Sequence, residues 1–161
     1  MNKAYLILGS NKGNKQDHLQ SALKSIEEKA GKISVKSSVF STKAWGNTNQ
    51  PDFYNQAILI ETELSPQDLL KQLLFIEKEE GRIRTKEKWQ ERTLDIDILF
   101  YNNDIITTPE LTIPHPHIQN RMFVLVPMVQ IAMRFVHPLL DKSMMLLMAE
   151  CEDKLEVKIV K

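Results

Sequence analysis

Two aspartates, Asp95 and Asp97, interrupt an otherwise apolar stretch that runs from Leu94 to Phe100. Because strand side chains alternate between faces, the apolar residues of this stretch, Phe100 included, are predicted to point into a core. The two acids then share the other face, with Cα atoms ~7 Å apart. Aspartate is a poor strand former, and a divalent cation such as Mg²⁺, or a pair of ions, would explain two of them on one face. The alternative is an exposed strand face with two solvated acids.

The arginines of the chain are concentrated just before these acids. Three of the five, Arg82, Arg84 and Arg92, fall within eleven residues. Arginine makes forked contacts to phosphate, so the arginines and the acids together predict a site for a metal–phosphate complex. Alternatively, the loop arginines pair with neighbouring glutamates at the surface, in contacts worth only ~0–1 kcal/mol each.

Aromatic side chains occur in two polar segments. Trp89 lies in the arginine loop, where it either closes over a flat ligand or anchors the loop. Trp45, Phe53, Tyr54 and Asn55 lie in or beside a second loop, and aromatic faces with one amide suit a planar heterocycle. Aromatic residues near strand ends are also ordinary core residues, so this second pattern is open on its own.

His115 is a further candidate because prolines flank it in Pro114-His115-Pro116-His117. The rigid backbone would present His115 as a hydrogen-bond donor to an anion, with Arg121 adding positive charge. The two histidines lack a further cysteine or histidine at a useful spacing, which argues against zinc. A rigid surface turn is the alternative interpretation.

The elements that position these residues follow from apolar periodicity and from helix caps. Strands are predicted at 5–8, 33–40, 53–63, 94–101 and 156–160, and helices at 14–30, 65–81, 120–132 and 143–151. The order is roughly βαββαβ, followed by helices and an edge strand. It predicts an α/β (α+β) domain with a mixed or antiparallel sheet and helices on one side.

Composition narrows the class of protein. The chain has 161 residues, with 21 Lys and Arg against 21 Asp and Glu, so a single domain over 1–161 without a basic surplus is expected. Such a chain is a poor candidate for binding nucleic acid or an acidic membrane. Cys151 is the single cysteine, and no apolar run reaches membrane-spanning length. We therefore expect a cytoplasmic monomer.

The spaced motifs resemble the 6-hydroxymethyl-7,8-dihydropterin pyrophosphokinase family. The resemblance is carried by Leu8-Gly9-Ser10-Asn11, 50–55, Ile76-Glu77, 81–84, Trp89, 92–99, Pro114-His115 and 120–123. It implies a ferredoxin-like α+β domain that works with two Mg²⁺ ions. It also implies transfer of the pyrophosphoryl group of ATP to the hydroxymethyl group of the pterin, giving AMP and the pterin diphosphate, in folate biosynthesis.

The resemblance also implies roles for individual residues. Asp95 and Asp97 would hold metal, with Arg82, Arg92 and Asp97 catalytic; Glu77, Arg84, Arg92, Ile98, His115 and Arg121 would bind ATP; Thr42, Trp45, Phe53, Asn55, Trp89 and Phe123 would bind the pterin. Three places depart from the family pattern, namely Gln90-Glu91, Glu110 and Pro116. Two alternatives stay open, another metal-dependent phosphotransferase or nucleotidyltransferase and a non-catalytic nucleotide-binding module.

Overall fold

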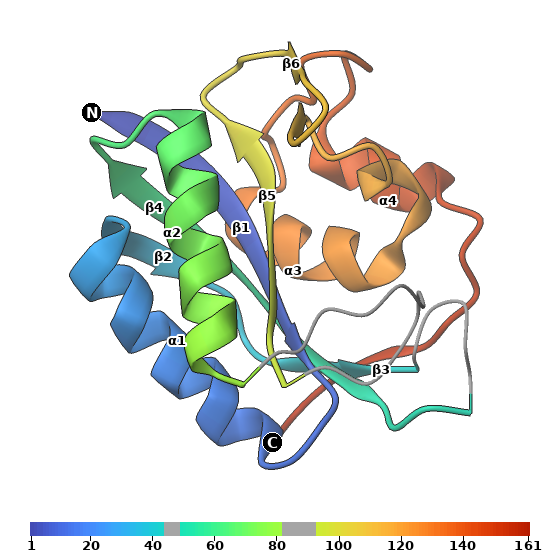
Figure 1. The fold of residues 1–161 in the computed structure, drawn as a ribbon. Coiled ribbons are helices and arrows are strands. Elements are labelled where there is room, and N and C mark those ends of the chain that lie inside the picture. Colours follow the sequence, from blue (N-terminus) through green and yellow to red (C-terminus); the bar gives the residue numbers. More distant parts are fainter. Residues whose placement is uncertain (44–48, 82–92) are drawn as a thin grey trace.

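The computed structural model describes residues 1–43, 49–81 and 93–161 (Figure 1). Its strands are β1 (Asn2–Ser10), β2 (Lys32–Lys36), β3 (Phe40–Thr42), β4 (Phe53–Thr62), β5 (Asp95–Tyr101), β6 (Ile106–Thr107), β7 (Thr112–Ile113) and β8 (Val157–Ile159). Its helices are α1 (Lys15–Lys29), α2 (Pro66–Glu79), α3 (Met122–Ala132) and α4 (Met144–Glu150), with a short 3₁₀ helix at Ile118–Asn120. The predicted order of strands and helices is therefore confirmed, except that the predicted strand 33–40 is divided into β2 and β3 and that β6 and β7 were not predicted.

The main sheet is antiparallel at each of its pairings. Its order is β5-β1-β4-β3-β8, and β2 pairs with β4 beside β3. The strands of the βαββαβ unit thus have the order of a ferredoxin-like sheet, in which the first strand lies in the middle. A separate two-stranded ribbon, β6–β7, follows β5. The predicted α+β fold class is confirmed.

Helices cover both faces of this sheet, whereas the sequence predicted them on one side. One core lies between the sheet and α1 with α2, and a second core packs α3 and α4 against the opposite face (Figure 1). In β1, Leu6 and Leu8 enter the first core while Ile7 enters the second. A strand buried on both faces has a continuous apolar sequence, as residues 5–8 do, and this pattern does not say what covers each face.

Local signals set the two long helices. Asn14 Oδ1 accepts a hydrogen bond from Asp17 N at 3.1 Å, and Ser65 Oγ accepts one from Asp68 N at 3.1 Å. Both contacts satisfy backbone donors that a helix start leaves free. The helix starts predicted from these caps are confirmed. No helix in the described ranges has the length and apolar character that crossing a membrane requires.

An irregularity in β5 reverses one predicted orientation. In the pairing with β1, Leu6 faces Ile98 but Tyr5 faces Phe100, so Leu99 is an additional residue in β5. A bulge of this kind shifts the alternation of side chains by one. Phe100 consequently packs with Leu99 in the α3–α4 core, and the predicted grouping of Phe100 with Leu94 is wrong.

Candidate active site

The two aspartates lie on the sheet face opposite α1 and α2. Leu94, Ile96 and Ile98 are in the core beneath those two helices, so Asp95 and Asp97 point the other way, as predicted. The register places Asp95 beside Gly9 of β1, and Gly9 beside Asn55 of β4. This row brings a carboxylate and an amide onto one face across three strands, with the outer Cα atoms ~10 Å apart.

Gly9, in the middle of this row, leaves room for side chains of β4. A Cβ atom on Gly9 would lie 2.8 Å from Asn55 Oδ1 and 3.6 Å from Phe53 Cδ1. The space above Gly9 is therefore filled by the side chains of β4. The local sequence indicates no separate role for Gly9, because a glycine after a strand is equally explained by a turn.

The pterin-binding residues predicted on the sheet are close to one another. Asn55 Nδ2 donates to Thr42 Oγ1 at 3.1 Å, and both side chains are buried. Phe53 lies two residues before Asn55 on the same face of β4. The side-chain oxygen of Asn55, Oδ1, borders the space above Gly9. An amide fixed in this way presents a defined hydrogen-bonding edge.

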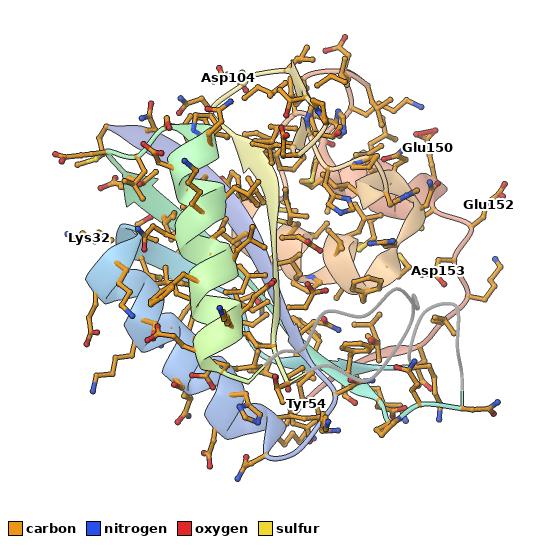
Figure 2. The ribbon with its side chains drawn as sticks, in the orientation of Figure 1. Lys32, Tyr54, Asp104, Glu150, Glu152 and Asp153 are labelled. Carbon is orange, nitrogen blue, oxygen red and sulfur yellow. The ribbon has the colours of Figure 1, made fainter. Side chains whose placement is uncertain are left out.

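Phe123 and Arg121 lie together at the start of α3. The guanidinium carbon of Arg121 is 5.6 Å from the centre of the Phe123 ring. Asp153, on the segment between α4 and β8 (Figure 2), accepts a hydrogen bond from Met122 N at 3.0 Å. A residue 31 positions further along the chain thus supplies the cap that this helix start lacks locally. Asp153 was not predicted as a site residue, because no local spacing in the sequence indicates such a contact.

His115 is held beside β5, the strand that carries Asp95 and Asp97. Its backbone N donates to Leu99 O at 3.0 Å, and its Nε2 is 3.9 Å from Asp97 Oδ2. Burial, then the nearby charges of Arg121 and His117, lower the pKa of His115 to about 4, although Asp95 acts in the opposite direction. His115 is therefore neutral at pH 7. Since Nδ1 accepts from His117 N at 3.2 Å, the ring proton belongs on Nε2, the atom that faces Asp97.

Two predicted ATP-binding residues, Glu77 and Ile98, lie on the side of β5 that faces α1 and α2. Glu77 is 2% exposed, and its Oε2 accepts a hydrogen bond from Ile96 N at 2.7 Å. This contact supports β5 along its open edge. The side chain of Ile98 is buried in the core with α1 and α2, so a nucleotide contact from Ile98 would have to come from its main chain.

Five predicted site residues cannot be placed. Arg82, Arg84, Trp89, Arg92 and Trp45 lie outside the described residues. Their predicted roles stay predictions.

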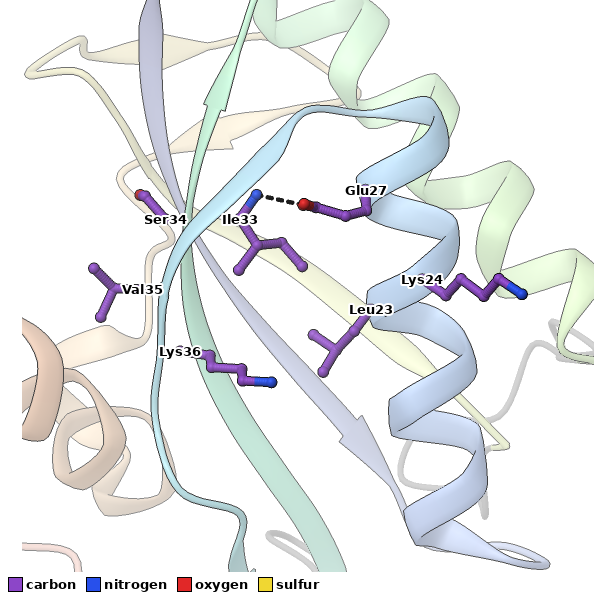
Figure 3. A pocket seen from close by; sticks show the side chains of 7 residues that line it. All are labelled: Leu23, Lys24, Glu27, Ile33, Ser34, Val35 and Lys36. Carbon is purple, nitrogen blue, oxygen red and sulfur yellow. Dashed lines mark hydrogen bonds between the residues drawn. The ribbon is translucent and has the colours of Figure 1, made fainter.

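A hollow on the surface lies away from these residues. It is bounded by α1 and β2 and lined by Leu23, Lys24, Glu27, Ile33, Ser34, Val35 and Lys36 (Figure 3). None of its lining residues belongs to the predicted site. The hollow therefore does not mark the candidate active site.

The acidic pair fits a metal only together with a substrate. Within the described ranges, no group of three carboxylate, histidine or cysteine side chains is placed to hold an ion. Asp97 is 39% exposed, so its carboxylate is accessible to a ligand. Mg²⁺ commonly binds one or two carboxylates and completes its shell with water and substrate phosphates. Asp95 and Asp97 match that requirement.

The fold and the site define a ferredoxin-like α+β domain whose sheet carries paired carboxylates and a fixed amide on one face. The sequence model for 7,8-dihydro-6-hydroxymethylpterin-pyrophosphokinase matches residues 5–133. The chain belongs to this pyrophosphokinase family, and it is an enzyme of that kind. The family predicted from the sequence is confirmed.

Similar proteins agree with this assignment. A 2-amino-4-hydroxy-6-hydroxymethyldihydropteridine pyrophosphokinase of Haemophilus influenzae is 46% identical over 136 residues, or 84% of each chain. A protein of the same name from Aquifex aeolicus is 38% identical over 144 residues, or 89% of each chain.

Solved structures share the fold. A crystal structure described as HPPK-DHPS in complex with substrates has a TM-score of 0.74 at 17% identity, over 92% of this chain. Plasmodium falciparum HPPK-DHPS with pteroate has a TM-score of 0.76 at 17% identity. The chain spans only 43% and 44% of those two chains.

Proposed function

We propose that this enzyme transfers the pyrophosphoryl group of ATP to the hydroxymethyl group of 6-hydroxymethyl-7,8-dihydropterin, giving AMP and the pterin diphosphate, in folate biosynthesis. The observation that carries the proposal is the row Asp95–Gly9–Asn55, which places an acidic strand and a fixed amide on one sheet face. The names of the family and of the relatives support the same reaction.

In this proposal the acids and the histidine form the phosphate side of the site. Asp95 and Asp97 would hold two Mg²⁺ ions, which when bound would neutralise charge on the triphosphate and make the pterin hydroxyl a better nucleophile. His115 would donate a hydrogen bond from Nε2–H to a phosphate oxygen, which is consistent with its neutral ring and with Nδ1 acting as an acceptor. Arg121 would add positive charge to the same side, and Glu77 would keep β5 in place.

The pterin side would be formed by β3, β4 and α3. Asn55, oriented by Thr42, would read the polar edge of the ring through its carboxamide. Phe53 and Phe123 would pack on the two faces of the ring, a favourable arrangement for a flat aromatic ligand. The reaction needs in-line placement of the hydroxyl and the β-phosphorus more than it needs a covalent group. We assign no general base.

The loop residues complete the proposal. Arg82 and Arg92 would stabilise charge during the transfer, and Arg84 would bind ATP. Trp45 and Trp89 would contact the pterin. These roles rest on the family resemblance.

We further propose that residues 1–161 act as a single domain and as a monomer in the cytoplasm, without nucleic-acid or membrane partners. The balance of 21 basic and 21 acidic residues supports the last part. The exposed lysines of the edge strand β2, Lys32 and Lys36, would repel a second copy that paired along that edge.

A product assay tests the reaction. The protein is incubated with Mg-ATP and 6-hydroxymethyl-7,8-dihydropterin, and the nucleotides are separated. AMP that appears in step with loss of the pterin is the expected result. ADP would indicate transfer of a single phosphoryl group and a different kinase. If a folded, ATP-binding protein left the nucleotide unchanged, the non-catalytic binding module would replace the enzyme as the better account.

A further inference from the structure

The turn between β1 and α1 holds the segment that leads into β4. Asn11, buried directly after β1, donates from Nδ2 to Gln50 Oε1 at 3.0 Å and to Pro51 O at 3.1 Å. Lys15, the first residue of α1, donates from Nζ to Asp52 O at 3.0 Å. Two side chains that are distant in sequence from β4 thus fix three successive residues before it.

Lys15 makes a second contact inside β4 itself. Its Nζ lies 4.4 Å from the centre of the Tyr54 ring, a cation–π distance. Tyr54 packs at the margin of the core beneath α1 and α2, and Figure 2 shows it at the end of the sheet near the start of α1. Lys15 therefore contacts β4 from the face that α1 and α2 cover.

The residues on either side of Tyr54 are Phe53 and Asn55, which point to the opposite face. Side chains alternate along a strand. A shift or rotation of the β4 backbone at Tyr54 would therefore move Phe53 and Asn55 together. Asn11 bonds to Gln50 and Pro51, whereas Lys15 contacts Tyr54, the residue that lies between Phe53 and Asn55 in the sequence.

We propose that Lys15 is a positioning residue for the pterin: it acts through the Asp52 carbonyl and the Tyr54 ring to hold Phe53 and Asn55 in the orientation that receives the ring. This inference rests on the proposed function. Lys15 itself need not touch substrate.

Lys15→Met tests the proposal, since it keeps an apolar stem but removes the charge and the donor. The matched control is Lys12→Met, because Lys12 is an exposed lysine of the same turn. With Lys15→Met we expect the pterin KM to rise about tenfold, the effect of losing one charge-assisted hydrogen bond. The ATP KM should change less than about twofold, since the phosphate side does not depend on this contact. Lys15→Arg keeps a cation and donors and should restore most of the pterin affinity.

Hydrogen exchange in the free protein gives a readout that does not depend on activity. The amides of Gln50 and of residues 52–55 should exchange faster in Lys15→Met than in wild type or Lys12→Met. Unchanged exchange there, or an equal rise in both KM values, would overturn the positioning role. If wild type converts no pterin although the exchange difference is present, the proposed function is refuted while the contact itself stands.

Discussion

Gly9 and Asn55 face each other in the β1–β4 ladder, and the Asn55 carboxamide occupies the space that a side chain on Gly9 would need. The position of Asn55 in the candidate site therefore depends on Gly9. Glycine is required here because a larger side chain would collide with Asn55, and not because the backbone φ is positive. The contact links a residue of the first strand to the amide assigned to the pterin.

Gly9→Ala is expected to displace Asn55 from Thr42. Overpacking of this kind typically costs about 1–3 kcal/mol, and the pterin KM should rise more than the ATP KM. Urea unfolding and steady-state kinetics measure the two effects. If the clash with Asn55 is the cause, the stability lost through Gly9→Ala should be smaller in an Asn55→Ala background. Equal losses in both backgrounds would contradict this account.

Glu77→Ala should weaken β5, because it leaves the buried Ile96 N–H without its acceptor. The expected loss of stability is about 1–3 kcal/mol. Glu77→Gln keeps a carbonyl oxygen at the same place and should recover most of it. Denaturant unfolding of the three proteins checks the prediction, and a Gln variant as unstable as the Ala variant would argue against a hydrogen-bonding role.

His115 makes the free protein less stable as the pH falls. Its pKa in the folded protein, about 4, lies below the ordinary histidine value near 6.5, so the unfolded chain binds this proton more readily. The contribution of neutral His115 to the free energy of unfolding is fully present above pH ~6.5 and is lost as the pH falls toward 4. It amounts to at most about 3 kcal/mol. Burial also lowers the pKa of His137, so that histidine acts in the same direction.

The comparison of wild type with His115→Gln isolates the contribution of His115. Unfolding free energies measured at pH 7.5 and pH 4.5 should differ less in the variant. His137 is unchanged in both proteins and cancels in the comparison. Equal pH dependence in the two proteins would show that His115 is not protonated more readily after unfolding.

Asp97→Asn should abolish most turnover while the fold is retained. The carboxylate is 39% exposed, so stability does not depend strongly on its burial. Loss of a charge that stabilises the transferred phosphates is expected to reduce kcat by about 10²-fold or more. Asp104→Asn, an exposed acid beyond the end of β5, is the matched control. Full turnover by Asp97→Asn would exclude the proposed metal role.

Local chemistry explains why parts of the site could be predicted. Asp95 and Asp97 share a face because strand side chains alternate, and this requires no knowledge of neighbouring strands. The same rule gave the wrong face for Phe100. The bulge at Leu99 depends on pairing with β1 and has no signature within the sequence of β5. The caps at Asn14 and Ser65 were predictable since donor and acceptor lie three residues apart.

The sequence by itself determined the helix starts, the α+β class, the common face of the two acids and the family. Each of these depends on residue spacing within one segment or on the order of segments. Only the tertiary structure decided that helices cover both sheet faces, that Gly9 makes room for Asn55, and that Asp153 caps α3. These features join residues far apart in the chain, and the packing of strands and helices determines which of them meet.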